Sequence, residues 1–88
     1  MNDLNKEIGL RIKFIRILRG ISRDELAEKL GITPGHLTRL ENGQRHIRTA
    51  TVIQCSKVLS VTVDFLVKGN DEFYKVYTES ALYKDQLK

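Results

Sequence analysis

The sequence contains one cysteine, Cys55, one proline and no tryptophan. A single cysteine cannot form an internal disulfide, and this usage is typical of a protein in a reducing cytosol. No apolar run approaches the roughly 20 residues that span a bilayer, and the polar residues 1–7 do not resemble a signal peptide. These absences argue against a disulfide-rich secreted domain and a membrane-spanning helix, so we expect a cytoplasmic protein.

The sequence also lacks the patterns of catalytic and metal sites. It shows no nucleophile paired with a base, no Gly-rich phosphate loop and no Cys or His pairs at the spacing of metal ligands. Cys55 is better interpreted as a small core residue than as a redox sensor. We therefore expect no enzymatic activity, no metal and no cofactor.

The charge that is present is unevenly distributed along the 88 residues. Residues 1–69 carry 12 Lys and Arg against 7 Asp and Glu, whereas residues 70–88 carry 3 against 4. A basic body of this kind suits a polyanionic partner, most often nucleic acid, although a solvated surface would give the same balance. The hydrophobic content of 41% and the length indicate one small globular domain.

Helical signals follow one another with short connections, and no segment has the pattern of a strand. The serine and glutamate of Ser22-Arg23-Asp24-Glu25 form a capping box, and Thr33 followed by Pro34 is a typical helix start. The sequence predicts six helices: at 5–19, from Ser22 to Gly31, from Thr33 to Gly43, from Thr49 onward, at 63–67 and at 71–87.

The second and third of these helices are joined only by Gly31-Ile32-Thr33, which makes a helix-turn-helix. Ala27 is small where the two helices cross, and Leu37 and Leu40 give the second helix an inner side. In this motif the second helix is presented to the major groove of DNA, which is wide enough to admit one helix.

These segments resemble the Xre-like helix-turn-helix family, that of the phage repressors and Cro proteins. The matching stretches are IGLRIKFIR, ISRDELAEKLGIT, LTRLENG and TVIQCSKVLSVTVDFL, about two-thirds of the chain. The resemblance implies an all-α, five-helix, lambda-repressor-like DNA-binding domain at 1–69. The additional C-terminal helix expected within 70–88 is an extension beyond the family core. The resemblance also implies a bacterial or phage-encoded, nucleoid-associated homodimer that binds a palindromic operator in double-stranded DNA, most commonly as a repressor.

The resemblance places the recognition segment at 33–39, and helical geometry decides which of its side chains face outward. Arg39 can present a guanidinium fork to guanine, Thr38 can touch a thymine methyl or donate to a base, and His36 can donate to a base or a phosphate. The expected base contacts are Gly35, His36, Thr38 and Arg39, Gly35 through its backbone. The expected phosphate contacts are Ser22, Arg23, Thr33, Asn42, Gln44, Arg45 and Arg48, with His46 nearby as a loop residue.

Two further expectations concern the frame around this segment. Arg16 and Glu41 match a family pair that joins the first and third helices, and Glu41 lies on the inner side, where a charge needs a partner. We therefore predict an Arg16–Glu41 salt bridge. Ser60 stands where relatives usually have glycine, which predicts a strained or differently closed end of the fourth helix.

A dimer surface is expected on the fifth helix and the tail, and its residues are Val63, Phe65, Leu66, Val67, Phe73 and Tyr77. The first helix is apolar nearly all round, and such a helix is usually buried on more than one side. We expect the tail helix to cover its outer face, around Leu10, Phe14, Ile17 and Leu18, within one subunit or across a dimer. The alternative is a frayed tail with exposed aromatic residues.

Two other functions stay open at this point. The chain is also compatible with an antitoxin whose tail binds a toxin, and with a protein-interaction module that has lost DNA binding. The basic residues Arg39, Arg45 and Arg48 favour DNA over the second alternative. Control of a restriction–modification operon, of a phage or of a mobile element is equally compatible with the sequence.

Overall fold

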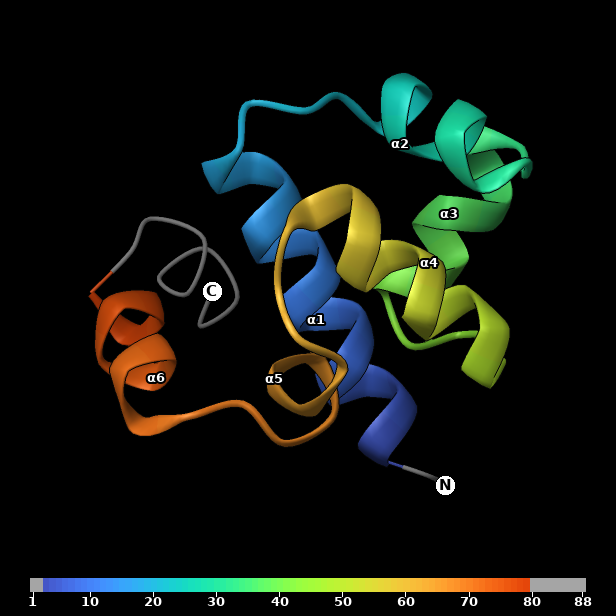
Figure 1. Cartoon of the computed structure of the whole chain (residues 1–88). Coiled ribbons are helices and arrows are strands. Elements are labelled where there is room, and N and C mark those ends of the chain that lie inside the picture. The colour runs from blue at the N-terminus through green and yellow to red at the C-terminus, as the bar shows by residue number, and fades with distance from the viewer. Residues whose placement is uncertain (1–2, 80–88) are drawn as a thin grey trace.

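The computed structural model describes residues 3–79 and is all-helical over this range (Figure 1). The helices are α1 (Asp3–Leu18), α2 (Arg23–Leu30), α3 (Pro34–Glu41), α4 (Thr49–Leu59), α5 (Val63–Lys68) and α6 (Asp71–Thr78). The expected all-α fold is confirmed. α1 runs through the middle and packs against α3, α4 and α5, while α6 lies on the side away from α2 and α3 (Figure 1). None of the described helices is long and apolar enough to cross a bilayer.

The turn between α2 and α3 is fixed by local chemistry. Ser22 Oγ accepts a hydrogen bond from the Glu25 amide, and the Glu25 carboxylate accepts one from the Ser22 amide, which completes the capping box. Thr33 Oγ1 caps α3 by accepting from the His36 amide. Gly31 adopts a left-handed φ of 70°, which glycine tolerates without steric cost. The chain can therefore reverse in three residues and hold α3 against α2.

The core is built from apolar faces of the first five helices. Its buried side chains are Ile8, Ile12, Phe14, Ile15, Leu26, Ala27, Leu30, Leu37, Leu40, Ile47, Val52, Cys55, Leu59 and Leu66. Burial, together with the nearby Glu41 charge, raises the pKa of the Cys55 thiol to about 12. Little reactive thiolate is present at neutral pH, as expected for a core cysteine.

Arg11 in α1 and Arg19 directly after it tie the ends of two other helices to α1. Arg11 is buried and its Nη1 donates to the carbonyls of Leu66 and Val67, at 3.0 and 2.9 Å, where α5 ends. Arg19 Nε donates to the Leu59 carbonyl at the end of α4, at 2.9 Å. Because the last carbonyls of a helix lack partners within the helix, these cations complete both helix ends.

Ser60 follows α4 in a left-handed conformation, with φ 56° and ψ 45°. A non-glycine residue pays roughly 1–2 kcal/mol there. The Ser60 amide donates to the Ser56 carbonyl, and the Arg19 bond to Leu59 holds the preceding residue in place. The strained helix end expected from the sequence is therefore present, and a tertiary contact from Arg19, directly after α1, supports it.

Leu66 corrects the expected dimer surface. The sequence assigned it to the interface, but its side chain is fully buried in the core, so it is not a surface contact. α5 has only six residues and four of them are apolar, so its pattern does not single out Leu66 as the residue that faces inward. Val63 is 37% exposed, and Phe65 and Val67 are half-buried. Phe73 and Tyr77 lie outside the described side chains.

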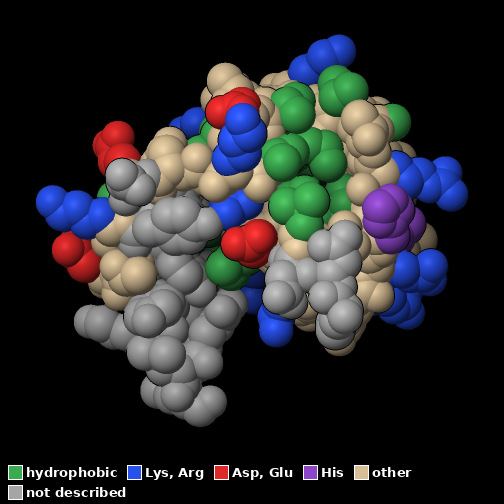
Figure 2. Space-filling model, turned by 90° about the horizontal axis from the view of Figure 1, so that it is seen from below, with side chains coloured by type: hydrophobic (Ala, Val, Ile, Leu, Met, Phe, Trp, Pro, Cys, Tyr) green, Lys and Arg blue, Asp and Glu red, His purple; other side chains and the backbone are tan. Residues whose placement is uncertain are grey.

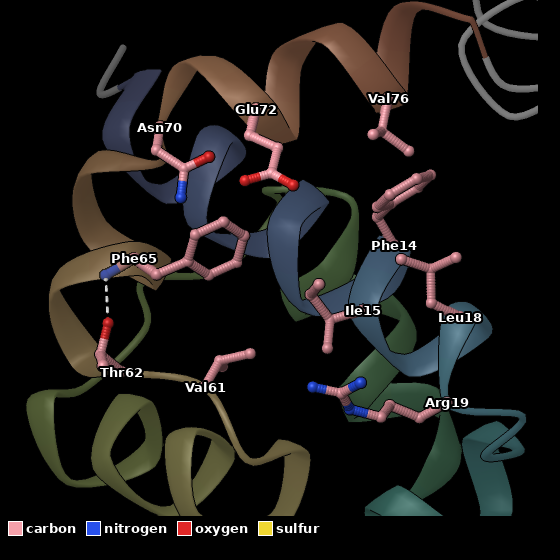
Figure 3. A pocket seen from close by; sticks show the side chains of 10 residues that line it. All are labelled: Phe14, Ile15, Leu18, Arg19, Val61, Thr62, Phe65, Asn70, Glu72 and Val76. Carbon is pink, nitrogen blue, oxygen red and sulfur yellow. Dashed lines mark hydrogen bonds between the residues drawn. The ribbon is translucent and has the colours of Figure 1, made fainter.

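The described part of the tail borders a groove with α1 and α5. Phe14, Val61, Phe65 and Val76 stand around this groove (Figure 3). Phe14 is buried, yet Leu18 on the next turn of α1 is 58% exposed. Over residues 3–79 the tail therefore leaves part of the outer face of α1 open. The expected helix beyond residue 79 lies outside the described residues.

Gly9 marks the closest approach of α1 to α3. A Cβ atom at this position would overlap the Leu40 carbonyl oxygen and lie 2.9 Å from the Glu41 carbonyl oxygen. Gly35, in α3, would place a Cβ in open space. The two helical glycines therefore differ in what an added methyl group meets.

We predict that Gly9→Ala lowers the free energy of unfolding by about 1–3 kcal/mol, because the added methyl group forces α1 and α3 apart. This loss outweighs the higher helix propensity of alanine. Gly35→Ala is the control, and we expect it to stabilise the chain slightly. Urea titrations followed by circular dichroism measure both, and equal stabilities of the two variants would contradict the prediction.

Candidate nucleic-acid interface

The outward side of α3 carries the residues expected to contact bases. Gly35 and Arg39 are exposed and His36 and Thr38 half-buried, whereas Leu37, on the opposite side, is buried in the core. Arg39 lies in the last turn of α3. The helix therefore presents a bare backbone at its start and a guanidinium group near its end.

Thr38 requires a correction to its expected chemistry. Its hydroxyl donates to the Pro34 carbonyl, with an Oγ1–O distance of 3.0 Å. The hydroxyl proton is therefore engaged within α3, as is common for a threonine four residues after a helical carbonyl. In this arrangement the hydroxyl proton is not free for a base, whereas the other predicted contact, to a thymine methyl group, needs no proton. The methyl group and the oxygen lone pairs remain to face a partner.

Ser22 and Thr33 show the opposite arrangement. Each hydroxyl oxygen accepts a bond from its own helix, at 3.1 Å from the Glu25 and His36 amide nitrogens. A hydroxyl that accepts keeps its proton for another partner. Both residues are exposed, so each can donate to an anion placed at the start of α2 or α3.

The loop at 44–48 forms a basic hollow with α3 and the start of α4. Arg45, His46 and Arg48 line it together with His36. Ile47 is buried between them, and its amide donates to Asn5 Oδ1 at 3.2 Å, which anchors the loop to α1. The structure thus brings His36 into the same hollow as two of the expected phosphate contacts.

The remaining expected phosphate contacts lie at the edges of this surface. Asn42 is exposed at the end of α3, and Gln44 is exposed at the start of the loop. The backbone amide of Gln44 donates to the Arg39 carbonyl. Arg48 precedes α4 as its N-cap, but its side chain makes no capping bond. The start of α4, beside the basic hollow, therefore has no side-chain cap.

Glu41 is the buried charge behind this surface, at the last residue of α3. Its carboxylate accepts from Arg16 through two bonds, Nε to Oε2 at 2.7 Å and Nη2 to Oε1 at 3.2 Å. Arg16 also donates to the Ile21 carbonyl at 3.0 Å. The ion pair expected between α1 and α3 is therefore present, in the two-bond geometry that fits a guanidinium to a carboxylate.

A second cation reaches the same carboxylate. Arg23 Nε lies 3.3 Å from Glu41 Oε1, and the Arg23 side chain is 42% exposed. The sequence predicted Arg23 as a phosphate contact and did not predict its bond to Glu41. Arg23 is the first residue of α2, which the helix-turn-helix holds beside the end of α3. This position is the sequence feature that could have indicated the bond between Arg23 and Glu41.

The comparison with known families bears directly on this geometry. A family model described as "Helix-turn-helix" matches residues 12–66, which include α2, α3, Glu41 and the C-terminal part of α1. The chain belongs to this helix-turn-helix family. The resemblance to Xre-like proteins is thereby confirmed.

Relatives of this helix-turn-helix chain are named as transcriptional regulators. The HTH-type transcriptional regulator YqaE of Bacillus subtilis is 34% identical over 70 residues, which cover 80% of this chain and 60% of that protein. An HTH-type regulator of Sinorhizobium medicae is 31% identical over 64 residues, which cover 73% of this chain and 46% of that protein. The chain thus spans about half the length of these relatives.

Solved helix-turn-helix structures share the fold. The restriction–modification controller protein C.AhdI from Aeromonas hydrophila has a TM-score of 0.65 at 26% identity, over 73% of this chain and 91% of that one. The P22 c2 repressor, solved with a synthetic operator, has a TM-score of 0.66 at 24% identity, over 72% and 96%. The five-helix, lambda-repressor-like fold is therefore shown for this chain.

We predict that Arg16 and Glu41 are strongly coupled in stability. Glu41→Gln leaves the buried Arg16 without an anionic partner, and Arg16→Met leaves the buried Glu41 with only the part-exposed Arg23, so each change should cost about 3–5 kcal/mol. The double variant should cost much less than the sum. Arg16→Lys, which keeps the charge but loses the fork, provides a milder test where the other variants fail to fold.

The exposed pair Asp64–Lys68, with a 3.3 Å separation, is the matched control for this double-mutant cycle. Exposed pairs of this kind contribute roughly 0.3–0.5 kcal/mol in helices. Chemical unfolding of all variants measures both coupling energies. A coupling between Arg16 and Glu41 no larger than that of the control pair would contradict the prediction.

Proposed function

We propose that the chain is a transcription regulator that binds double-stranded DNA at a specific sequence and acts as a repressor. The observation that carries this proposal is the outward Arg39 on α3, a helix whose inner end is held by the buried Glu41. A rigid helix with one exposed guanidinium is suited to reading the major groove. The P22 c2 repressor, which shares the fold, was solved in complex with an operator.

In this mechanism α3 enters the major groove with its exposed side toward the base edges. Arg39 donates to O6 and N7 of a guanine, a contact worth about 1–3 kcal/mol of discrimination. The Thr38 methyl group packs on a thymine methyl group. Because Gly35 has no side chain, the backbone at the start of α3 can approach the groove closely.

Phosphate contacts frame α3 on both sides in the proposed complex. Ser22 and Thr33 donate their hydroxyl protons at the starts of α2 and α3, and Arg23 adds charge beside the first of these. The second group lies after α3 and comprises Asn42, Gln44, Arg45 and Arg48. These contacts supply affinity that falls with salt and set the register of α3, while the bases supply specificity.

We also propose that the chain binds a palindromic operator as a homodimer. Figure 2 shows hydrophobic side chains gathered on the lower face of the molecule, where α5 lies. Val63 of α5 is 37% exposed, and we propose it as the centre of the dimer surface together with Phe65 and Val67. Two recognition helices then sit about 34 Å apart, one helical turn of DNA. Repression requires only that the dimer occupy its operator.

A protein partner is the second candidate function. The observation in its favour is the groove between α1, α5 and α6, beside the exposed Leu18. An antitoxin that binds its toxin here, while α3 binds DNA, would use both surfaces. Co-purification of a second protein with the tagged chain would support this candidate.

We predict a palindromic consensus when purified protein selects fragments from genomic DNA at two salt concentrations. Arg39→Ala should relax one guanine in each half-site, with a loss of about 1–3 kcal/mol of discrimination there. Lys75→Ala on α6, on the side away from α3, removes the same charge and should leave the consensus unchanged. Binding without a consensus and with a steep salt dependence would reduce the role of DNA to backbone attraction.

We predict that Val63→Glu converts the dimer to a monomer, because it places two carboxylates against each other across the symmetry axis. Sedimentation equilibrium measures the change, and binding to an isolated half-site should persist. Val76→Glu on α6, also at an exposed apolar position, is the control and should leave a dimer. A monomer from Val76→Glu but not from Val63→Glu would move the dimer surface to α6.

A further inference from the structure

Arg23 makes a bond that the burial of Glu41 does not require. Arg16 alone places a donor on each carboxylate oxygen, at 2.7 Å on Oε2 and 3.2 Å on Oε1. Arg23 adds a third bond, at 3.3 Å, to the oxygen that already has a partner. The neutralisation of Glu41 therefore leaves the role of Arg23 unexplained.

The position of Arg23 allows its side chain to interact with a buried group and with a group at the surface at the same time. It is the first residue of α2, and its side chain is 42% exposed while that of Glu41 is fully buried. Nε points inward to Glu41. A guanidinium that uses Nε on one carboxylate keeps its Nη1–Nη2 edge for a second anion. Within residues 3–79, the structure pairs Arg23 with no other acidic side chain.

The cluster of Arg16, Arg23 and Glu41 also carries a net positive charge at its exposed side. Arg16 and Arg23 bring two positive charges to the one negative charge of Glu41. The surplus belongs to Arg23, because Arg16 is the buried partner and is bonded twice. A half-exposed positive charge at a helix start is well placed for a phosphate, which the neighbouring α2 amides also favour.

We propose that Arg23 is a positioning residue that couples a DNA phosphate to the recognition helix. Its outer edge binds the phosphate, and its Nε simultaneously holds Glu41, two residues beyond Arg39 on α3. The backbone contact and the orientation of α3 in the groove thereby become one unit. This inference rests on the proposed DNA-binding function and assigns part of its sequence specificity to a residue that touches no base.

Lysine at position 23 separates the two roles. An ammonium group is a single compact charge, so it can attract a phosphate but lacks the second edge that holds Glu41 at the same time. Arg23→Lys should therefore keep attraction to any duplex and lose the coupling to α3. Because Arg16 still neutralises Glu41, the melting temperature should stay close to that of the unchanged chain.

The test uses the operator obtained by selection and a scrambled duplex of the same length. Dissociation constants for both duplexes are measured over a range of salt for the unchanged chain, Arg23→Lys and Arg45→Lys. Arg45 is an exposed loop arginine proposed to contact phosphate alone. For Arg23→Lys we expect about tenfold weaker operator binding, with scrambled binding and the salt slope unchanged. For Arg45→Lys we expect the ratio of the two constants to be preserved.

Three results would overturn the inference. An equal loss on both duplexes with Arg23→Lys would make Arg23 a phosphate contact only. A lower melting temperature with a preserved ratio would make its bond to Glu41 purely structural. An equal loss of the ratio with Arg45→Lys would show that any arginine fork on this surface has the same effect. If the protein without substitutions selects no operator, the proposed DNA-binding function is wrong, and the role proposed for Arg23 fails with it.

Discussion

The buried carboxylate of Glu41 is the constraint on which the recognition surface depends. A charge at the inner end of α3 has to be neutralised, and Arg16 does so from α1 in a two-bond geometry. A well-packed apolar pair at this position would often be as stable as an ion pair. The ion pair in addition restricts the orientation of α3 relative to α1, because a planar guanidinium and a planar carboxylate form two bonds in few orientations. The outward side of α3 is therefore fixed relative to α1.

α1 acts as the common support for the other helices through long side chains rather than through apolar packing alone. Arg11 reaches the end of α5 and Arg16 reaches α3, while Arg19, directly after α1, reaches the end of α4. Each bond replaces water on a group that folding removes from solvent. At Gly9 the helix has no side chain at all, which lets the backbone of α3 come close enough for the Arg16 bond to form. The spacing between helices and the electrostatic contacts are thus mutually dependent.

The sequence predicted those features that depend on neighbouring residues. The capping box at Ser22 and the cap at Thr33 involve partners within three positions along the chain. The Arg16–Glu41 pair and the unusual conformation of Ser60 were predicted because the family resemblance supplied the partner and the usual glycine. Arg11 and Arg19 were missed because they bond to backbone carbonyls 40 or more residues away, and any residue type offers a carbonyl. The sequence therefore does not indicate which carbonyl the side chain of Arg11 or of Arg19 bonds.

The site was predicted less completely than the fold, for a related reason. Helical spacing gives the direction of a side chain, but it does not say how a polar group divides its bonds. Thr38 faces outward as expected, yet its proton goes to Pro34, so α3 offers bases a methyl group and lone pairs at this position. Ser22 and Thr33 accept within the fold and keep their protons for a partner. Donors therefore gather where phosphates are expected, and Arg39 is left as the principal donor to a base on the exposed side of α3. In the proposed complex, a surface of this composition would favour guanine at one position and would depend on the backbone, held by Glu41 and Arg23, for the rest of its register.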